Sequence, residues 1–345
     1  MTNTPEGCNL DHIRSHSEIF KQTLEPSNFK KDKMNEITIV SYLRKNETIN
    51  KSFYELVNTF QMNHLLCRVV IFSDVERTDF PLKYSLVVDQ GRTKYARLKK
   101  LITSGQDLYI LSIDSDITLS IESSIEFCEN FIQSDSSIGW GHIGVSNYGM
   151  VPNMVSIDKI LSHNYIRPLL WDLHCGISIP GQFFIIRRHD YEKILIPDDT
   201  FLDDLQIGLI TKKAKFKVFR PAIITGREYA KETLKDLFQQ RKRWAKGYSS
   251  ILKTAFRLST QHFSLVVIHG MFYHVLFPLL IAFTCMLSLY NPFITLLSYI
   301  VIAIILVNKN FRLLLEALLY PVFFPILHLY WGYHLILNLW SNENE

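Results

Sequence analysis

The chain has 345 residues, enough for one large domain or two smaller ones, and 48% of them are apolar, so core size is not limiting. Its net charge of +4 at pH 7 is too small to indicate a nucleic-acid partner, and none is expected. Five cysteines without a C-x-x-C pair argue against a zinc site and fit reduced thiols.

Regular structure is predicted from about residue 36 onward. Residues 1–35 are polar and show no apolar period, so we interpret them as a loosely ordered N-terminal arm. The apolar, β-branched run at 36–43 is typical of a strand, and the apolar residues of 50–65 recur at helical spacing. This part of the chain therefore predicts a strand followed by a helix.

Short apolar strands and helical segments alternate in the next part of the chain. Strands are predicted at 67–74, 84–89 and 108–116, and the basic stretch 92–105 is predicted to form a helix. This alternation indicates βαβ units, and so an α/β fold with a mostly parallel sheet.

Two of these strands end in aspartates. Asp74 closes the strand at 67–74, while Asp114 and Asp116 close the strand at 108–116 as a D-x-D pair. Because ligands of open α/β sheets bind at the carboxyl ends of the strands, we expect these acids to gather at one edge. A single aspartate at such a position is also common as a turn or helix cap, so that alternative stays open for each of them.

The pattern loosens after the D-x-D pair. A helix is predicted over 117–132, a glycine-containing strand or loop over 139–153, and a strand over 183–186.

A further helix is predicted to begin at Asp203 and Asp204 and to end at Lys212 and Lys213, before a strand at 215–219. Acids in the first turn and cations in the last suit the helix dipole, so a capping role alone would explain both aspartates.

A D-x-D pair after an apolar strand also suggests a divalent metal site. Mg²⁺ or Mn²⁺ bound by one or two carboxylates completes its shell with water and substrate phosphates, so the metal would bridge a diphosphate. A nucleotide is the obvious diphosphate, and the metal would make it a leaving group. A second carboxylate away from the metal would act as the base on an acceptor hydroxyl, and Asp204 is the candidate.

The stretch LFQQRKRWAKGY, residues 237–248, combines cations with a tryptophan. Written as a helix, it places Gln240, Arg243 and Trp244 on one face, where the guanidinium suits a phosphate and the indole suits a sugar ring or a base. The cations Arg241, Lys242 and Lys246 fall elsewhere on the helix, and we expect them to meet lipid headgroups.

Three long apolar runs fill the last part of the chain, at 265–287, 293–307 and 313–337. We expect a membrane domain at 265–340 with about three transmembrane helices, preceded by an interfacial linker helix at 249–264. A very hydrophobic C-terminal helical core is the alternative, supported by the histidines and the glutamate scattered through these runs.

Charge in the connections sets the expected orientation. The link NKNFR between the second and third runs is basic and the link SLYNP between the first two is not, so the positive-inside rule places NKNFR in the cytoplasm. With three spans, everything before the first run lies on the same side. We therefore expect an integral protein of the cell (inner) membrane whose catalytic domain is cytoplasmic.

The order of these motifs resembles that of the membrane-bound family 2 glycosyltransferases, the group with cellulose, chitin and hyaluronan synthases. The matching residues are Asp74, then Asp114-Ser115-Asp116, then Asp203-Asp204, then Gln240-x-x-Arg243-Trp244, with the apolar runs behind them. The resemblance covers about residues 36–248 and implies a GT-A-like nucleotide-sugar-binding domain there. It also implies an inverting, metal-dependent hexosyltransferase that uses Mg²⁺ or Mn²⁺.

The resemblance implies a role for each matching residue. Asp74, Asp114 and Lys94 would bind the nucleotide sugar, Asp116 the metal, and Asp204 would be the base, while Gln240, Arg243, Trp244 and Asp203 would line the acceptor and diphosphate site. Asp89 is the rival of Asp74, and Arg97 is the rival of Lys94. Trp171, His174 and Gln182 are candidate pocket residues, and ordinary packing is an equal alternative for each.

The leading hypothesis is transfer of a sugar from a UDP-sugar to a lipid-linked acceptor or a growing saccharide, in contact with membrane lipids. A processive polysaccharide synthase is one alternative, although three spans are few for an enzyme that threads its own polymer through the bilayer. A membrane-anchored basic binding module and a metal-dependent phosphotransferase are the alternatives from other classes.

Overall fold

The computed structural model describes residues 37–62, 67–77, 84–195, 199–307 and 310–341. The arm predicted at 1–35 and the four residues after Ser341 lie outside the described residues.

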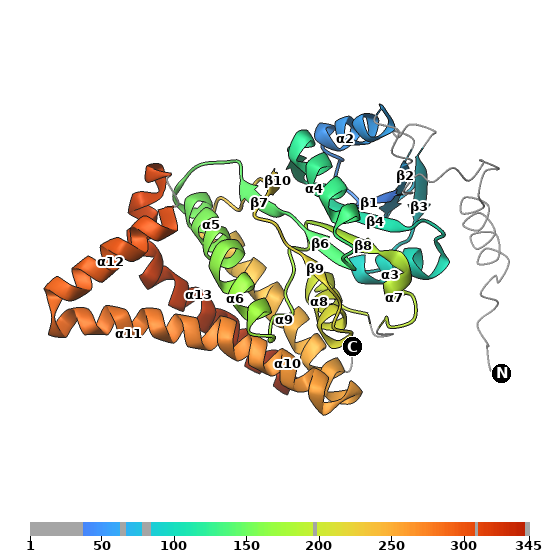
Figure 1. Ribbon diagram of the computed structural model, residues 1–345. Helices are drawn as coiled ribbons and strands as arrows, with labels where there is room; N and C mark the ends of the chain where they lie inside the picture. The colour runs from blue at the N-terminus through green and yellow to red at the C-terminus, as the bar shows by residue number, and fades with distance from the viewer. Residues whose placement is uncertain (1–36, 63–66, 78–83, 196–198, 308–309, 342–345) are drawn as a thin grey trace, which may run out of the picture.

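Seven strands form the main sheet, in the order β3-β2-β1-β4-β8-β6-β9 (Figure 1). They are β1 (Ile37–Leu43), β2 (Cys67–Ser73), β3 (Ser85–Val88), β4 (Tyr109–Asp114), β6 (Ile138–Trp140), β8 (Phe183–Arg187) and β9 (Val218–Phe219). Strands β1 to β4 run parallel, and β8 is antiparallel to both of its neighbours, β4 and β6. The α/β class and the mostly parallel sheet expected from the sequence are therefore confirmed.

A second, three-stranded sheet has the order β5-β10-β7, with β5 at Ile117–Leu119, β7 at His142–Val145 and β10 at Ile224–Glu228. The helix predicted to begin at residue 117 is wrong at its start. Buried Ile117 and Leu119 flank exposed Thr118, which is the period of a strand, and the three residues pair with β10.

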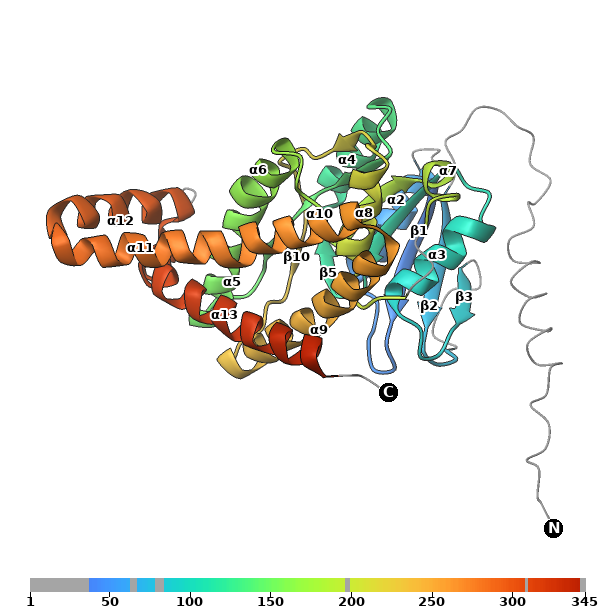
Figure 2. The same ribbon diagram turned by 90° about the horizontal axis from the view of Figure 1, so that it is seen from below.

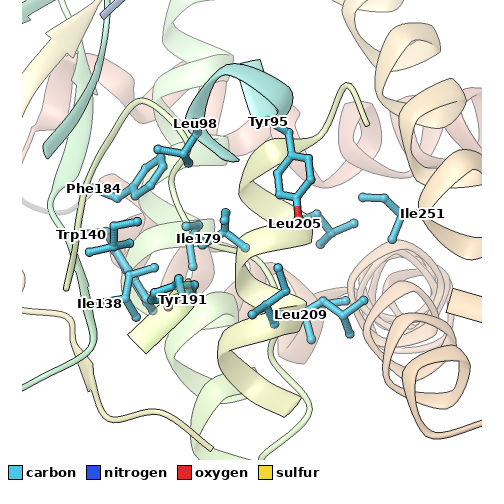
Figure 3. Close-up of a cluster of buried hydrophobic side chains, with 14 of the residues drawn as sticks. Tyr95, Leu98, Ile138, Trp140, Ile179, Phe184, Tyr191, Leu205, Leu209 and Ile251 are labelled. Carbon is cyan, nitrogen blue, oxygen red and sulfur yellow. The ribbon is translucent and has the colours of Figure 1, made fainter. Parts of the chain in front are cut away.

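Helices cover both faces of the main sheet (Figure 1). Those of the sheet-forming part are α2 (Lys51–Met62), α3 (Lys94–Ser104), α4 (Ile121–Gln133), α7 (Arg188–Tyr191) and α8 (Asp203–Lys213). Successive side chains of β1 alternate between the two sides: Ile39 joins the core under α2 and α4, whereas Val40 joins the core under α3 and α8. Figure 3 shows the second core, to which Leu98 of α3, Leu205 of α8 and Ile251 of α9 (Leu234–Leu258) all belong.

The remaining helices form the other end of the molecule: α5 (Met150–Leu161), α6 (Arg167–Asp172), α9 (Leu234–Leu258), α10 (Thr260–Gly270), α11 (Phe277–Tyr290), α12 (Pro292–Val307) and α13 (Leu314–Trp340). Helix α13 returns along α9 and α5 (Figure 2). The ring centroids of Trp331 in α13 and Tyr248 in α9 are 5.2 Å apart. Helix α9 is continuous through position 248, where the sequence analysis divided the catalytic domain from a linker helix.

Two described segments are long and apolar enough to cross a bilayer by length and composition, Thr260–Phe283 and Phe311–Trp340. The second predicted span is a helix, but its 16 residues reach only about 24 Å, less than the ~30 Å of a hydrocarbon core. Among the described residues there are thus two candidate spans, where the sequence analysis expected about three.

Candidate functional site

Three parallel strands end side by side and bring their acids to one edge of the sheet. The register places Leu43 of β1 opposite Ser73 of β2, and Tyr42 of β1 opposite Asp114, the last residue of β4. Asp74 follows Ser73 directly, and its amide donates to the Leu43 carbonyl at 3.2 Å. The convergence expected from the sequence pattern is therefore present for Asp74 and Asp114.

Lys94, the first residue of α3, lies at the centre of this edge. Its ammonium is 2.7 Å from Asp114 Oδ1 and 3.3 Å from Asp203 Oδ2, and it donates to the Gly181 carbonyl. Burial alone would lower the pKa of Lys94, but the charges of Asp114 and Asp203 outweigh burial and raise it. One cation thus joins the end of β4 to the beginning of α8.

Asp203 and Asp204 open α8 and face the same edge. Burial raises the pKa of Asp203 to about 7 against the charge of Lys94, and Asp204 and Asp114 add to the rise. Burial also raises the pKa of Asp204, although its Oδ1 accepts from the Leu205 amide at 2.8 Å. Favourable interaction with the helix dipole therefore explains only part of why these two acids are here, because both are also desolvated and Asp203 contacts Lys94.

Asp204 lies directly over Gly181. A Cβ at Gly181 would be 2.9 Å from the Asp204 Cβ, which is closer than real Cβ atoms approach. The segment before β8 therefore forms the floor on which the Asp204 side chain rests.

Asp116 is exposed on the solvent side of this edge of the sheet, just before β5. Desolvation raises its pKa to about 6, and the negative charges of Asp114, Glu228 and Glu47 contribute. Glu228 is the last residue of β10 and Glu47 follows β1, so carboxylates from three parts of the chain face the same space.

Asp74 is neutralised by Arg97 of α3, which is 4% exposed. The same guanidinium donates to the backbone carbonyl of Asp89, so the two rival aspartates are joined through one arginine. The Asp89 side chain itself lines a different cleft, of about 400 Å³, together with Arg92 and with Lys100 of α3. Lys94 and Arg97, the two rival basic residues, both reach this edge of the sheet, because Lys94 contacts Asp114 and Arg97 contacts Asp74.

Helix α9 carries Gln240, Arg243 and Trp244. A Cβ at Gly247, three residues after Trp244, would be 2.6 Å from Leu202, the residue just before Asp203, so α9 packs against the start of α8. Arg243 is exposed, and partial burial together with the like charge of Arg44 lowers its pKa. Trp244 is half-buried and packs against the core to which α8 and α9 both contribute. Among the residues that the structure describes, these three side chains form no hydrogen bond or ion pair with the aspartates of the sheet edge.

The expectation that Arg241 meets lipid headgroups is wrong. Arg241 is 5% exposed, its Nη2 lies 2.6 Å from Asp158 Oδ2 of α5, and its guanidinium lies 4.3 Å from the Trp244 ring centroid. The other oxygen of Asp158 accepts from the Tyr320 hydroxyl of α13 at 2.6 Å. Arg241 therefore ties three helices together, while Lys242 remains exposed.

Two residues of the site were missed by the sequence analysis. Glu228 Oε1 lies 3.2 Å from the ammonium of Lys159 in α5, and its other oxygen accepts from the Gln182 amide. Neither residue belongs to a motif, and only the order of the small sheet brings Glu228 beside β5. Of the three candidate pocket residues, Gln182 therefore lies in the site.

The other two candidate pocket residues lie elsewhere. Trp171 is buried against Trp140, with ring centroids 5.4 Å apart, and its indole donates to the Ser178 carbonyl at 2.9 Å. His174 contacts Lys212 at 3.3 Å. Ordinary packing explains Trp171.

The residues present fit a divalent cation that is completed by substrate. Among the described side chains, no three His, Cys, Asp or Glu residues form a group that could hold a metal on their own. Asp114, Asp116 and Glu228 nevertheless place more negative charge around this edge of the sheet than Lys94 and Lys159 offset. Such a set suits a metal bound by one or two carboxylates and by phosphate oxygens.

Comparisons with known proteins show the family and the fold of the chain. The profile of a family described as Glycosyl transferase family group 2 matches residues 109–330, and no curated protein sequence matches the chain. Among solved structures, the fold is similar to mannosyltransferase PcManGT from Pyrobaculum calidifontis, in complex with GDP-Man and Mn²⁺, with a TM-score of 0.52 and 13% identity over 96% of this chain and 95% of that one.

A weaker likeness links the chain to two further solved structures. Glucosyl-3-phosphoglycerate synthase from Mycobacterium tuberculosis aligns with a TM-score of 0.43 and 12% identity over 71% of this chain and 84% of that one. Mannosyl-3-phosphoglycerate synthase from Rubrobacter xylanophilus aligns with a TM-score of 0.44 and 11% identity over 66% and 75%.

Proposed function

The chain belongs to glycosyl transferase family group 2 and is a glycosyltransferase of GT-A type, and from this premise we propose that it transfers a sugar from a UDP-sugar, with inversion, to a lipid-linked or saccharide acceptor at a membrane. The observation that carries the proposal is the meeting of Asp114, Lys94 and Asp203 at the carboxyl ends of parallel strands, with Asp116 and Asp204 on either side. Open α/β sheets bind their ligands at this edge.

The donor side of the proposed site is formed by β2, β4 and α3. Asp74 follows β2 and Asp114 ends β4, the strands on either side of β1, and both would bind the nucleoside, while Lys94 would contact the diphosphate. Asp116 would hold Mg²⁺ or Mn²⁺, and the metal would supply charge that stabilises the departing nucleoside diphosphate. The exposed pair Arg243 and Arg44 adds positive charge suited to the same group.

Asp204 is the proposed base. Burial raises its pKa toward the operating pH, and a base works best when its pKa lies near that pH. Its position over Gly181 fixes the carboxylate beside Lys94 and Asp203. From there it would remove the proton of the acceptor hydroxyl as that oxygen attacks the sugar.

The membrane part of the proposal is supported by the surface of the apolar helices. Large apolar side chains are exposed along α11, α12 and α13, among them Leu280, Phe283, Leu297, Ile304 and Leu329. A contiguous apolar surface of this kind marks a membrane or a partner. We propose that these helices insert in the cell (inner) membrane, with the catalytic part on the cytoplasmic side.

Transfer assays on membranes containing the protein test the catalytic proposal. Labelled UDP-sugars and GDP-sugars are supplied with Mg²⁺ or Mn²⁺, and both nucleotide release and label in lipid or saccharide are measured. Asp204→Asn should reduce transfer by roughly 10²–10⁴-fold, because it removes the base. Asp135→Asn is the matched control: Asp135 is exposed after α4, at a positive φ that asparagine tolerates, and should retain activity.

The proposal would be overturned if no labelled donor supported transfer, or if Asp204→Asn were as active as Asp135→Asn. Product length separates its two forms. A single added sugar is expected, whereas a ladder of long products would indicate the processive polysaccharide synthase.

A further inference from the structure

Arg167, the first residue of α6, is a cation without a carboxylate partner among the described residues. Its Nη1 donates to His163 Nδ1 at 2.9 Å and its Nη2 contacts Ser178 Oγ at 3.5 Å. Its Nε–H is fully buried and has no hydrogen-bond partner. Burial lowers the pKa of Arg167. A desolvated guanidinium is costly to keep unless an anion pairs with it, so its charge calls for a ligand.

This guanidinium lies next to the proposed base. Ser178, which contacts Arg167, is three residues before Gly181, on which the Asp204 side chain rests. Three residues of extended chain span at most about 10 Å, so Arg167 and Asp204 are near neighbours. Their charges act on each other accordingly, because Arg167 opposes the rise in the pKa of Asp204.

The two side chains that contact Arg167 directly are a hydroxyl and a histidine ring, which leaves its charge free for an anion. His163 accepts from Arg167 through Nδ1, so its remaining ring nitrogen carries a hydrogen. The ring of His142 lies 4.7 Å from that of His163, and burial with the charge of Arg167 lowers the pKa of both histidines. Both rings are therefore neutral near pH 7, and neither competes with Arg167 as a cation.

Arg167 faces the side of the molecule that carries the apolar helices. Besides Asp204, the acid whose charge acts on it is Asp158 of α5, and Tyr273, from the π-helix η2 (Met271–Leu276) between α10 and α11, is a further neighbour. Lys94, in contrast, contacts Asp114 and Asp203 on the donor side. Asp204 thus lies between Lys94, which forms ion pairs with two acids, and Arg167, which forms no ion pair among the described residues.

We propose that Arg167, with Ser178 and His163, binds a phosphate group of the acceptor, so that the enzyme acts on a phosphorylated acceptor. A guanidinium with free N–H groups binds phosphate oxygens in a directed way. The inference rests on the proposed function for the identity of the acceptor site, but phosphate binding itself does not require turnover. The phosphate is carried either by a lipid or by a free metabolite.

Thermal unfolding with inorganic phosphate tests the site directly. Phosphate should raise the unfolding midpoint of the wild type, and Arg167→Met should lose that rise while keeping a ligand-free midpoint at or above that of the wild type, because an uncompensated buried charge is removed. Arg241→Met is the matched control. It breaks the buried pair with Asp158, so it should lower the ligand-free midpoint and keep the response to phosphate.

Two results would overturn the proposal. One is an equal phosphate response in Arg167→Met and wild type; the other is a ligand-free midpoint that falls in Arg167→Met as far as in Arg241→Met. Vesicles of phosphatidylcholine with and without phosphatidic acid separate the two sources. Stabilisation by the phosphatidic acid vesicles beyond the plain ones indicates a lipid phosphate, and stabilisation by inorganic phosphate alone indicates a free metabolite.

Nucleotide release from the donor in the absence of acceptor completes the design. Arg167→Met should still release nucleotide, changed only as far as the pKa of Asp204 changes, because Arg167 acts on the acceptor side. If the wild type released no nucleotide from any donor while its phosphate response persisted, the proposed function would fail and the phosphate site would stand. A loss of release in Arg167→Met would instead place Arg167 on the donor side and overturn the inference.

Discussion

At the scale of single residues, the pKa of Asp204 sets the pH dependence of transfer. Burial raises this pKa above the usual value of about 4, and a base that is protonated cannot accept the acceptor proton. Activity should therefore rise with pH through the elevated pKa and then level off. The acid limb of kcat/KM against pH measures the pKa in the free enzyme.

The same profile has an internal control, because Lys94 lowers the pKa of Asp204. In Lys94→Met the acid limb should move to higher pH, even where donor binding is weaker. A limb near pH 4 in the wild type, or a shift to lower pH in the variant, would contradict the role of Asp204 as the base.

Lys94 should also contribute to stability, because it neutralises two carboxylates at once. Lys94→Met leaves Asp114 and Asp203 without their cation, and breaking a largely buried pair costs about 3 kcal/mol. The folded pKa of Asp203, about 7, lies above its unfolded value, so the folded state loses stability as pH rises through that range. Without Lys94 the pKa rises further, and the penalty should be larger at pH 8 than at pH 5.

Urea unfolding of Lys94→Met at the two pH values measures this difference, and Lys100→Met, an exposed lysine of the same helix, is the control. An equal loss at pH 5 and pH 8 would show that the alkyl chain of Lys94, rather than its charge, stabilises the fold.

At the scale of elements, strands and helices were predicted most accurately where the apolar periodicity continues over many residues. The strands β1 to β4 and the helices α2, α3 and α8 follow from their patterns, and the parallel order of the strands places Asp74 and Asp114 at one edge. The pattern could not show that residues 117–119 form a strand, because that strand exists only through pairing with β10, more than a hundred residues later.

The direction of side chains on α9 shows the same limit. A helical period separates Arg241 from Arg243, but it does not tell which of them is buried. Arg241 is buried because α5 supplies Asp158, 83 residues away in sequence. Arg167, Lys159 and Glu228 were missed for a related reason, since each gains its role only from neighbours that the fold brings together.

The junction of α5, α9 and α13 gives a prediction at this scale. Arg241→Met should destabilise the protein by about 3–5 kcal/mol, because the carboxylate of Asp158 stays buried without its partner. The double variant with Asp158→Asn should lose less than the sum of the two single losses, because neither buried charge is then left alone. Tyr320→Phe, which removes one hydrogen bond to Asp158, should cost only about 1 kcal/mol.

Chemical denaturation of the four proteins in detergent completes this cycle. Additive losses in the double variant would mean that Arg241 and Asp158 stabilise the fold independently, and the junction would then not depend on their ion pair.

At the scale of the whole molecule, the apolar helices are tied to the catalytic part rather than attached by a flexible link. Helix α9 runs unbroken from the proposed acceptor side to the apolar end, and α13 returns along it (Figure 2). The sequence predicted apolar runs but not this return, because run length carries no information on what a helix packs against. The orientation of the catalytic edge relative to a membrane is thus fixed by packing.

This packing predicts which surface binds lipid. Leu279, Phe283 and Met286 lie on α11 at helical spacing and are 60%, 54% and 59% exposed, so they contribute little to the folded core. Replacing all three by serine should leave the unfolding midpoint nearly unchanged but weaken binding to phosphatidylcholine vesicles by about tenfold or more for each side chain, at roughly 1.5 kcal/mol of lost burial each. Vesicle flotation measures the bound fraction.

The control changes apolar side chains that are equally exposed but belong to the catalytic part. Met62, Leu108 and Leu173 are 69%, 48% and 54% exposed, and their replacement by serine should leave flotation unchanged. If the α11 variant floated as well as this control, the exposed apolar surface would serve another partner. Because α13 fixes α11 relative to the acid edge, a soluble α11 variant should retain nucleotide release while losing transfer to acceptors embedded in vesicles.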